Sequence, residues 1–374
     1  MPVSSRAMRW RLILLAVLPF LAPASADDRY SVPHDCDTPT RYEPVCGVAH
    51  DWTPAEAAAA LGSRDTAAIG QGNVLNILAR RASGPVALCC TIDAPLTRIS
   101  DSDLWALSVR VKDLDRAIID LQILPSGEQL TAYYGSHVGK PALSPHLLGR
   151  LAEEMLQSEA LGEARRLTIY VPPGHVASES IPVVYLADGA TLEAYAPAIE
   201  AEIVSGRIRP VLVVGIWPGM ADPGMRAREY LIGRSIPRFR NQRDFVVDEV
   251  MPFVEHAYGA SGKREERMLA GSSDGAAWAL SMGLKNPKLF GQVAALSLGW
   301  PPAADAIASD GRPRVFLAAG FLEPDFYHVT AQAAQRAQDS NVPIRFESFA
   351  SGHVLVAWQT MLADALAWSF PRGN

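Results

Sequence analysis

Cysteine is scarce in this chain, and long hydrophobic runs are scarcer. The 374 residues include four cysteines, and no two of them have the C-x-x-C spacing that favours a zinc site. Only one apolar run, at residues 12–22, suggests a targeting segment. Internal repeats and low-complexity tracts are also lacking, which excludes a repeat array. With 49% hydrophobic and 20% charged residues, the composition is that of a globular protein.

Basic side chains are outnumbered by acidic ones. Lys and Arg number 34 against 40 Asp and Glu, which gives a net charge of −6. An acidic chain binds nucleic acid poorly unless a local basic patch offsets the excess. We therefore expect no nucleic acid as a partner, and the motifs described below favour a small-molecule partner.

The first 26 residues have the parts of a secretory signal. Three arginines precede the apolar run 12–22, and the small residues Ala24, Ser25 and Ala26 follow it. The pattern predicts a signal peptide over residues 1–26 and a periplasmic or secreted mature protein. A membrane anchor is the alternative, but the run is short for a bilayer span. We expect no membrane anchor after cleavage.

An exported chain with an even number of cysteines is expected to form disulfides. Cys89 and Cys90 are neighbours in the apolar run PVALCCTI, which reads as a strand. Successive residues of a strand point to opposite faces, so a bond between these two would be strained. The favoured interpretation pairs Cys36 and Cys46 with this strand, and the connectivity stays open.

The pattern of apolar residues divides the rest of the chain into three parts. Residues 27–140 contain strand-like runs and predict a smaller, β-rich N-terminal domain. Residues 141–164 have leucines at helical spacing and predict a helical connector. Residues 165–374 alternate strands with helices, which predicts an α/β domain with a mostly parallel sheet and helices on both faces.

One short stretch, Gly271-Ser272-Ser273-Asp274-Gly275, has the G-x-S-x-G pattern of a nucleophile elbow. Ser273 has glycine two residues before it and two residues after it, whereas Ser272 does not. A sharp strand-to-helix turn needs small residues at those positions. A strand-like run precedes the motif and a helix-like run follows it, so Ser273 is the predicted nucleophile.

A serine nucleophile needs a base and an acid that orients the base. Two histidines follow Ser273, and His353 is the predicted base because it lies between the last strand and the last helix. His328 is read as a surface or packing residue. The acid should follow the strand RVFLAAG; Glu323 is preferred, and Asp325 is the alternative.

The oxyanion of the tetrahedral intermediate needs backbone N–H donors. One should come from Asp274, directly after the nucleophile, and another from the loop at Gly189 and Ala190. The Asp274 carboxylate would oppose this charge unless a cation offsets it.

An arginine-rich segment offers such cations. Residues 226–243 contain six arginines and one acid, and they follow a buried strand at the edge where α/β active sites open. Its residues Arg226, Arg228 and Arg234 are predicted to bind an anionic substrate. A solvated loop is the alternative.

Taken together, these motifs resemble the esterase branch of the α/β-hydrolases, which includes the enterochelin (enterobactin) esterases and the feruloyl esterases. The resemblance runs through LGEARRLTIYVPPG, VVYLADG, REYLIG, DEVMPFVEHAYG, AGSSDG, LAAGFLE and GHVLVAW. The run LTRISDSDLWALSVRVKDLDRAIIDLQI is similar to the N-terminal domain of enterochelin esterases, which is a β-sandwich.

The resemblance implies a serine esterase with an α/β-hydrolase domain, in which Ser273, His353 and Glu323 form the triad and neither a metal nor a cofactor is used. It favours an enterobactin-like siderophore ester as substrate, in iron acquisition. A carbohydrate acyl esterase acting on feruloyl or acetyl groups is one alternative. A non-hydrolytic binding protein with a degenerate site is another.

Overall fold

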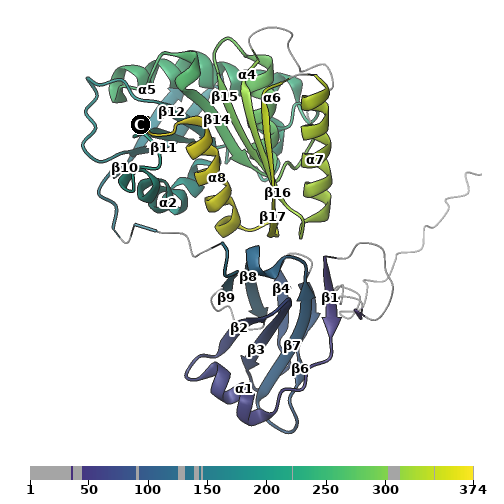
Figure 1. Ribbon diagram of the computed structural model, residues 1–374. Helices are drawn as coiled ribbons and strands as arrows, with labels where there is room; N and C mark the ends of the chain where they lie inside the picture. Colours follow the sequence, from purple (N-terminus) through teal and green to yellow (C-terminus); the bar gives the residue numbers. More distant parts are fainter. Residues whose placement is uncertain are drawn as a thin grey trace, which may run out of the picture.

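The computed structural model describes residues 35–36, 44–89, 92–124, 131–138, 143–144, 146–220, 222–301, 312–340 and 342–373 (Figure 1). The predicted signal peptide, residues 1–26, lies outside the described residues. Within the described part, no helix has the length and apolar character needed to cross a membrane.

The N-terminal part consists of two packed layers of strands with one helix. The first layer has the order β1-β7-β3-β2, with β6 beside β7. The second contains β4, β5, β8 and β9. Their bounds are β1 Val45–Val48, β2 Thr66–Gln71, β3 Val74–Arg80, β4 Val86–Cys89, β5 Ile92–Pro95, β6 Thr97–Arg98, β7 Leu104–Val111, β8 Ala117–Leu124 and β9 Thr131–Tyr134. Buried side chains from both layers, among them Ile77, Val109 and Leu121, share one core.

Helix α1 (Pro54–Leu61) begins as the sequence indicates. The Thr53 hydroxyl accepts a hydrogen bond from the Glu56 N–H, and the Glu56 carboxylate accepts one from the Thr53 N–H at 3.0 Å. This capping box satisfies two donors that a helix start leaves unpaired.

The expected cysteine pairing is wrong. Cys36 and Cys46 form a disulfide with each other, with their Cα atoms 4.9 Å apart. The Cys36 N–H donates to the Gly47 carbonyl at 3.0 Å, which holds Cys36 beside β1. The run PVALCCTI is also not one strand, because β4 ends at Cys89 and β5 returns antiparallel to it. Cys90 lies outside the described residues.

The predicted helical connector at 141–164 is also wrong. Its described residues contain no helix; instead β10 (Arg150–Ser158) pairs antiparallel along its whole length with β11 (Glu163–Val171). Gly162, at φ 70°, lies in the turn between them. Local helix propensity is a weak preference, and the long strand partner overrides it here.

Glu200 holds the segment before β10 in an extended path. Its carboxylate accepts hydrogen bonds from the N–H groups of Leu148 and Gly149, both at 2.7 Å, and from the Ser144 hydroxyl at 2.9 Å. Burial raises the pKa of Glu200, but these hydrogen bonds outweigh it and leave the pKa below its usual value. The backbone of this segment is therefore satisfied without a helix.

The main sheet runs in the order β10-β11-β13-β12-β14-β15-β16-β17. Its strands from β12 onward pair in parallel, whereas β10 and β11 are antiparallel. The remaining strands are β12 Val183–Ala187, β13 Leu212–Ile216, β14 Arg267–Ser272, β15 Gln292–Leu296, β16 Arg314–Gly320 and β17 Ile344–Ser351. Strand β15 was not predicted from the sequence.

Helices cover both faces of this sheet. Helices α2 (Leu192–Val204) and α8 (Leu355–Ser369) share a core with one face. The opposite face packs against α4, α5, α6 and α7. The bounds on that side are α3 Met225–Tyr230, α4 Ile236–Asp244, a π-helical segment Phe245–Val250, α5 Met251–Tyr258, α6 Asp274–Lys285 and α7 Pro324–Asp339. The α/β architecture expected for residues 165–374 is confirmed.

The N-terminal strands meet the main sheet at the end of β17. Ala350 and Ser351, its last residues, pair in parallel with Ala117 and Ile118 of β8. Leu322, which follows β16, packs into the N-terminal core. The N-terminal part therefore sits at the carboxyl edge of the sheet, below β16 and β17 in Figure 1.

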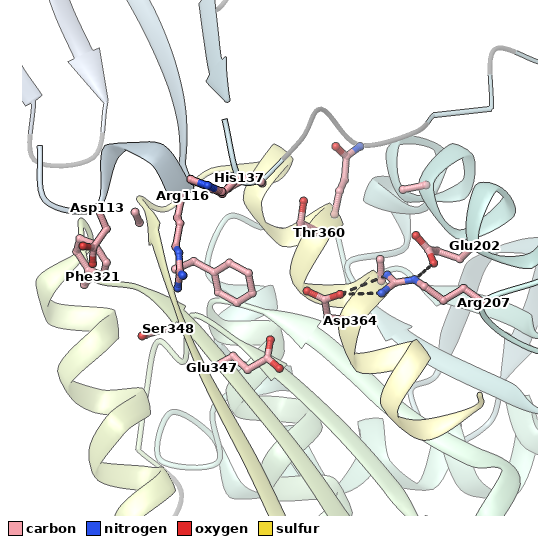
Figure 2. A pocket seen from close by; sticks show the side chains of 16 residues that line it. Asp113, Arg116, His137, Glu202, Arg207, Phe321, Glu347, Ser348, Thr360 and Asp364 are labelled. Carbon is pink, nitrogen blue, oxygen red and sulfur yellow. Dashed lines mark hydrogen bonds and ion pairs between the residues drawn. The ribbon is translucent and has the colours of Figure 1, made fainter. Parts of the chain in front are cut away.

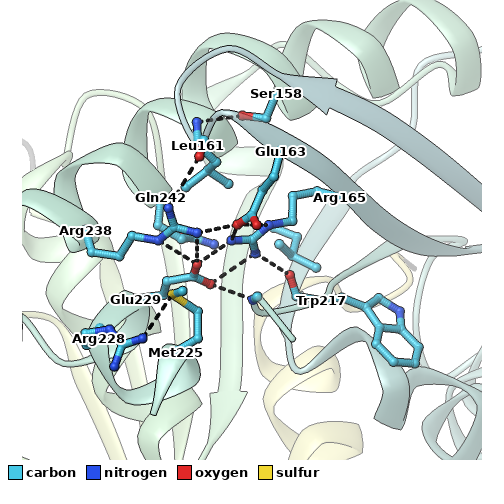
Figure 3. Close-up of polar contacts among 12 residues, drawn as sticks. Ser158, Leu161, Glu163, Arg165, Trp217, Met225, Arg228, Glu229, Arg238 and Gln242 are labelled. Atoms are coloured by element: carbon cyan, nitrogen blue, oxygen red, sulfur yellow. Dashed lines mark hydrogen bonds and ion pairs between the residues drawn. The ribbon is translucent and has the colours of Figure 1, made fainter. Parts of the chain in front are cut away.

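A buried ion network ties α3 and α4 to β11 (Figure 3). Glu229 is fully buried, and its carboxylate accepts hydrogen bonds from Arg165 Nη1 at 3.1 Å, from Arg238 Nε at 3.0 Å and from the Gly219 N–H at 3.0 Å. Both arginines also pair with Glu163. This network holds the arginine-rich segment, residues 226–243, against β11.

We expect Glu229→Gln to destabilise the fold by about 3–5 kcal/mol, because it leaves buried arginine charge uncompensated. The measurement is the free energy of unfolding in urea. The control is Glu265→Gln, which removes an exposed ion pair with Arg264 and should cost less than about 1 kcal/mol. Equal losses in the two variants would contradict this account of the network.

Candidate active site

Ser273 occupies a sharp turn between β14 and α6. Its φ of 59° and ψ of −126° are rare for a residue with a side chain. A Cβ at Gly271 would collide with the Gly275 backbone, and one at Gly275 would lie 2.9 Å from Ala187 Cβ. Both glycines of the motif are thus required by close backbone approach.

Ser272 has a different place from its neighbour. It is the last residue of β14, and its side chain is hydrogen-bonded to Tyr195. Burial raises the pKa of the Tyr195 phenol well above its usual value. Ser272 therefore contributes to packing below the turn.

Glu323 and His353 lie in direct contact. The Glu323 Oε2 atom is 2.6 Å from His353 Nδ1. The other oxygen, Oε1, accepts hydrogen bonds from the Gly320 N–H at 2.8 Å and from the Ser297 hydroxyl. Glu323 is 5% exposed. The carboxylate is thus held in one orientation, with one oxygen left for the histidine.

Trp358 extends this chain of hydrogen bonds. Its indole N–H donates to the Ser297 hydroxyl at 2.8 Å, and that hydroxyl donates to Glu323. The edge of the same indole meets the His353 ring, with ring centroids 4.7 Å apart and planes at 89°. Phe326 stacks on His353 at 3.9 Å. The imidazole is therefore oriented by its acid partner and by two aromatic rings.

The contact with Glu323 occupies Nδ1 of His353, so Nε2 is the ring nitrogen that faces away from Glu323. Among the described residues, no hydrogen bond joins Ser273 Oγ to His353 Nε2. The two residues follow β14 and β17, which end at the same edge of the sheet. Their direct interaction belongs to the proposal below.

The two alternatives in the sequence lie elsewhere. Asp325 and His328 are exposed residues of α7. The ring of His328 meets that of Tyr327, with centroids 6.2 Å apart. Of the acids and histidines that the sequence offered, Glu323 and His353 are the pair in contact.

Both predicted groups of oxyanion donors lie at helix starts. Asp274 is the first residue of α6, and Gly189 is the first residue of a 3-10 turn, Gly189–Thr191, that includes Ala190. N–H groups at a helix start have no acceptor within the helix. Gly189 permits close packing, because a Cβ there would lie 2.6 Å from the Gly215 carbonyl oxygen. Since β12 and β14 are neighbours, the two loops are adjacent.

The Asp274 carboxylate finds its cation in the arginine-rich segment. Arg226 Nη1 donates to Asp274 Oδ2 at 2.7 Å. The same guanidinium donates from Nε and Nη2 to the two oxygens of Asp188, at 2.7 and 2.8 Å. Burial lowers the pKa of Arg226, but the hydrogen bonds and charges of its partners outweigh it and raise the pKa overall.

The other two arginines predicted to bind substrate differ in their surroundings. Arg228 forms an ion pair with Asp222. The guanidinium of Arg234 lies over the Trp300 ring, 5.8 Å from its centroid. Trp300 is exposed, and the N–H of the preceding Gly299 donates to the Ser273 carbonyl at 3.2 Å. Arg234 and Trp300 thus lie at the rim of the elbow.

Several residues of this site were not predicted from the sequence. Asp188, Ser297, Phe326 and Trp300 received no role, although each follows a strand or opens a helix at the carboxyl edge. Trp358 appeared only as part of a motif. The only signal in the sequence was their position after a strand or at the start of a helix. That position does not indicate which other residue each side chain contacts.

A cavity of about 900 Å³ lies between α2, α8, β17 and turns of the N-terminal part (Figure 2). Its lining includes Arg116, Arg207, Phe321, Glu347 and Asp364, and does not include Ser273, Glu323 or His353. Arg207 is paired with Glu202 and Asp364. Among the described residues, no group of three or more His, Cys, Asp or Glu side chains is placed to hold a metal ion.

Comparison with known proteins identifies the family of the chain. The family model described as "Putative esterase" matches residues 158–369, more than half of the chain. The Bacillus subtilis (strain 168) protein YbbA, described as uncharacterized, is 25% identical over 184 residues, which cover 44% of this chain and 72% of YbbA.

Solved structures show the fold. The ferric enterobactin esterase of Salmonella typhimurium matches with a TM-score of 0.68 and 17% identity, over 81% of this chain and 95% of that one. The enterobactin esterase of Shigella flexneri matches with a TM-score of 0.66, 17% identity and the same coverage. A ferulic acid esterase of Anaeromyces mucronatus matches with a TM-score of 0.52 and 16% identity, over 60% of this chain and 92% of that one. The chain therefore belongs to this esterase family and is a carboxylic ester hydrolase with an α/β-hydrolase fold.

Proposed function

We propose that the chain hydrolyses its ester through a Ser-His-Glu triad. Ser273 Oγ attacks the ester carbonyl while His353 Nε2 takes its proton and later gives it to the leaving alcohol. Water then attacks the acyl-enzyme, again with His353 as base. Glu323 stabilises the imidazolium through Nδ1. The N–H groups of Asp274 and of the Gly189–Ala190 turn bind the oxyanion.

The observation that carries this proposal is the oriented Glu323–His353 pair beside a strained serine elbow. The 2.6 Å contact at Nδ1 fixes which nitrogen faces away from Glu323. The elbow exposes Ser273 at a helix start whose N–H groups lack acceptors within the helix. A degenerate binding site would not require a buried carboxylate held by three partners.

For the substrate, we favour an enterobactin-like siderophore ester. The enterobactin esterases match over 81% of the chain, including N-terminal strands, whereas the ferulic acid esterase matches over 60%. Arg234, stacked on exposed Trp300, offers a cation and an aromatic face at the rim for a catecholate. Arg226 and Arg228 are less suited, because carboxylates already neutralise them. A feruloyl or acetyl ester is the second candidate.

We place the mature protein in the periplasm or outside the cell. The leader pattern of residues 1–26 supports this, and so does the Cys36–Cys46 disulfide, because disulfides persist in oxidising compartments.

The direct test measures hydrolysis of enterobactin, a feruloyl ester and p-nitrophenyl butyrate by the wild type, Ser273→Ala and Ser272→Ala. We expect Ser273→Ala to lower kcat by at least about 10⁴-fold on every substrate, and Ser272→Ala to stay within about tenfold of the wild type. Full activity of Ser273→Ala would overturn the mechanism. Faster turnover of the feruloyl ester than of enterobactin would transfer the substrate assignment to the second candidate.

Trp358→Phe keeps an aromatic ring against His353 but removes the indole donor to Ser297. We expect kcat to fall about tenfold, the value of roughly one hydrogen bond, with KM unchanged. Trp368→Phe, in the same helix but over Arg314, is the control and should retain kcat. A normal kcat in Trp358→Phe would exclude a role for the Trp358–Ser297–Glu323 chain.

Arg234→Ala should raise KM for ferric enterobactin about tenfold and leave KM for neutral p-nitrophenyl butyrate unchanged, because only the anion uses the charge. Arg228→Ala, which breaks an outlying ion pair, is the matched control and should change neither value. The same KM in Arg234→Ala and the wild type would remove Arg234 from the substrate site.

A further inference from the structure

Arg226 connects the two backbone segments that the proposed mechanism uses for the oxyanion. Its Nε and Nη2 atoms bind both oxygens of Asp188, the residue just before Gly189. Its Nη1 atom binds Asp274, the residue just after the nucleophile. One planar guanidinium therefore joins the loop after β12 to the start of α6, and its fork geometry fixes their separation.

The arginine is itself held in place from a third element. It extends from α3, and its guanidinium lies over the Tyr230 ring, 5.3 Å from the centroid. The Tyr230 hydroxyl accepts a hydrogen bond from the Asp188 N–H at 2.9 Å. Tyr230 is buried and also contacts Trp278 of α6, with centroids 5.8 Å apart. The same aromatic side chain thus supports Arg226, Asp188 and α6.

Arg226 also balances the negative charge of the two carboxylates that it binds. Asp188 Oδ2 lies close to the elbow, since a Cβ on Gly275 would be 3.1 Å from it. Asp188 and Asp274 would together place two negative charges beside the point where the substrate carbonyl becomes an anion. Like charges near a developing oxyanion oppose the reaction. Arg226 compensates the charge of both carboxylates. It does not occupy the backbone N–H groups of Asp274 and of the Gly189–Ala190 turn, which the proposed mechanism uses for the oxyanion.

We propose that Arg226 is a positioning residue for the oxyanion site and not an anchor for the substrate. Three of its donors are used within the protein, and its side chain is 33% exposed. It sets the gap between the Gly189–Ala190 turn and the Asp274 N–H, and it cancels the charge that surrounds them. This inference rests on the proposed esterase mechanism.

The experiment uses neutral p-nitrophenyl butyrate and anionic ferric enterobactin with the wild type, Arg226→Gln, Arg226→Lys and the triple variant Arg226→Gln/Asp188→Asn/Asp274→Asn. We expect Arg226→Gln to lower kcat about 10²-fold on both substrates, comparable to the loss of one oxyanion donor, with KM changed less than about threefold. Arg226→Lys, which cannot bind bidentately, should lose at least tenfold. The triple variant should recover about tenfold over Arg226→Gln, because the uncompensated charges are gone.

Two outcomes would overturn the inference, in full or in part. A normal kcat for the neutral ester in Arg226→Gln, with a raised KM for ferric enterobactin only, would overturn the inference and make Arg226 a substrate anchor. No recovery in the triple variant would overturn the charge-compensation role. If Arg226→Gln fails to fold by circular dichroism, Arg226→Lys and the triple variant carry the same comparison. Failure of the proposed mechanism is distinguishable, because it appears as full activity in Ser273→Ala.

Discussion

Parallel pairing in the main sheet is the constraint on which the candidate site depends. Strands β12, β14, β15, β16 and β17 lie side by side in that order, so their carboxyl ends share one edge. The residues that follow them are Asp188, Ser273, Ser297, Glu323 and His353. Residues separated by up to 165 positions in the chain thereby become neighbours or near neighbours. The helices on both faces and the N-terminal strands support this edge and do not supply the residues of the proposed triad.

Negative charge is the second constraint on the site, because three carboxylates lie around the place where the proposed reaction would generate an anion. Each has a defined partner. Glu323 is held by Gly320, Ser297 and His353, and Asp188 and Asp274 share Arg226. The arginine-rich segment looks like an anion-binding surface in the sequence. In the structure, four of its six arginines are paired with acids from other segments or from within it.

The sequence was sufficient where the information is local. The two glycines predicted a sharp turn at Ser273, and the structure has that turn, because such a turn is a property of a few adjacent residues. The strand–helix alternation indicated a parallel sheet, and Thr53 with Glu56 marked a helix start. The order of serine, acid and histidine along the chain predicted Glu323 and His353 as partners, and the structure places these two in contact.

Features that depend on distant partners were missed or wrong. Residues 150–158 look helical until β11 is known to pair with them, and the Cys36–Cys46 bond depends on a backbone contact at Gly47. The partners of Arg226 lie 38 and 48 positions away, and Trp358 reaches Ser297 across 61. No local pattern encodes such contacts, because many residues of the same type could make them.

We propose above that the hydroxyl oxygen of Ser273 is the nucleophile of a working esterase site. The most direct measurement is mass spectrometry of the protein after reaction with a fluorophosphonate, which phosphonylates an activated serine. We predict a single adduct on Ser273, and no adduct in His353→Ala. An adduct on Ser272, or labelling of Ser273 that is unchanged in His353→Ala, would contradict it.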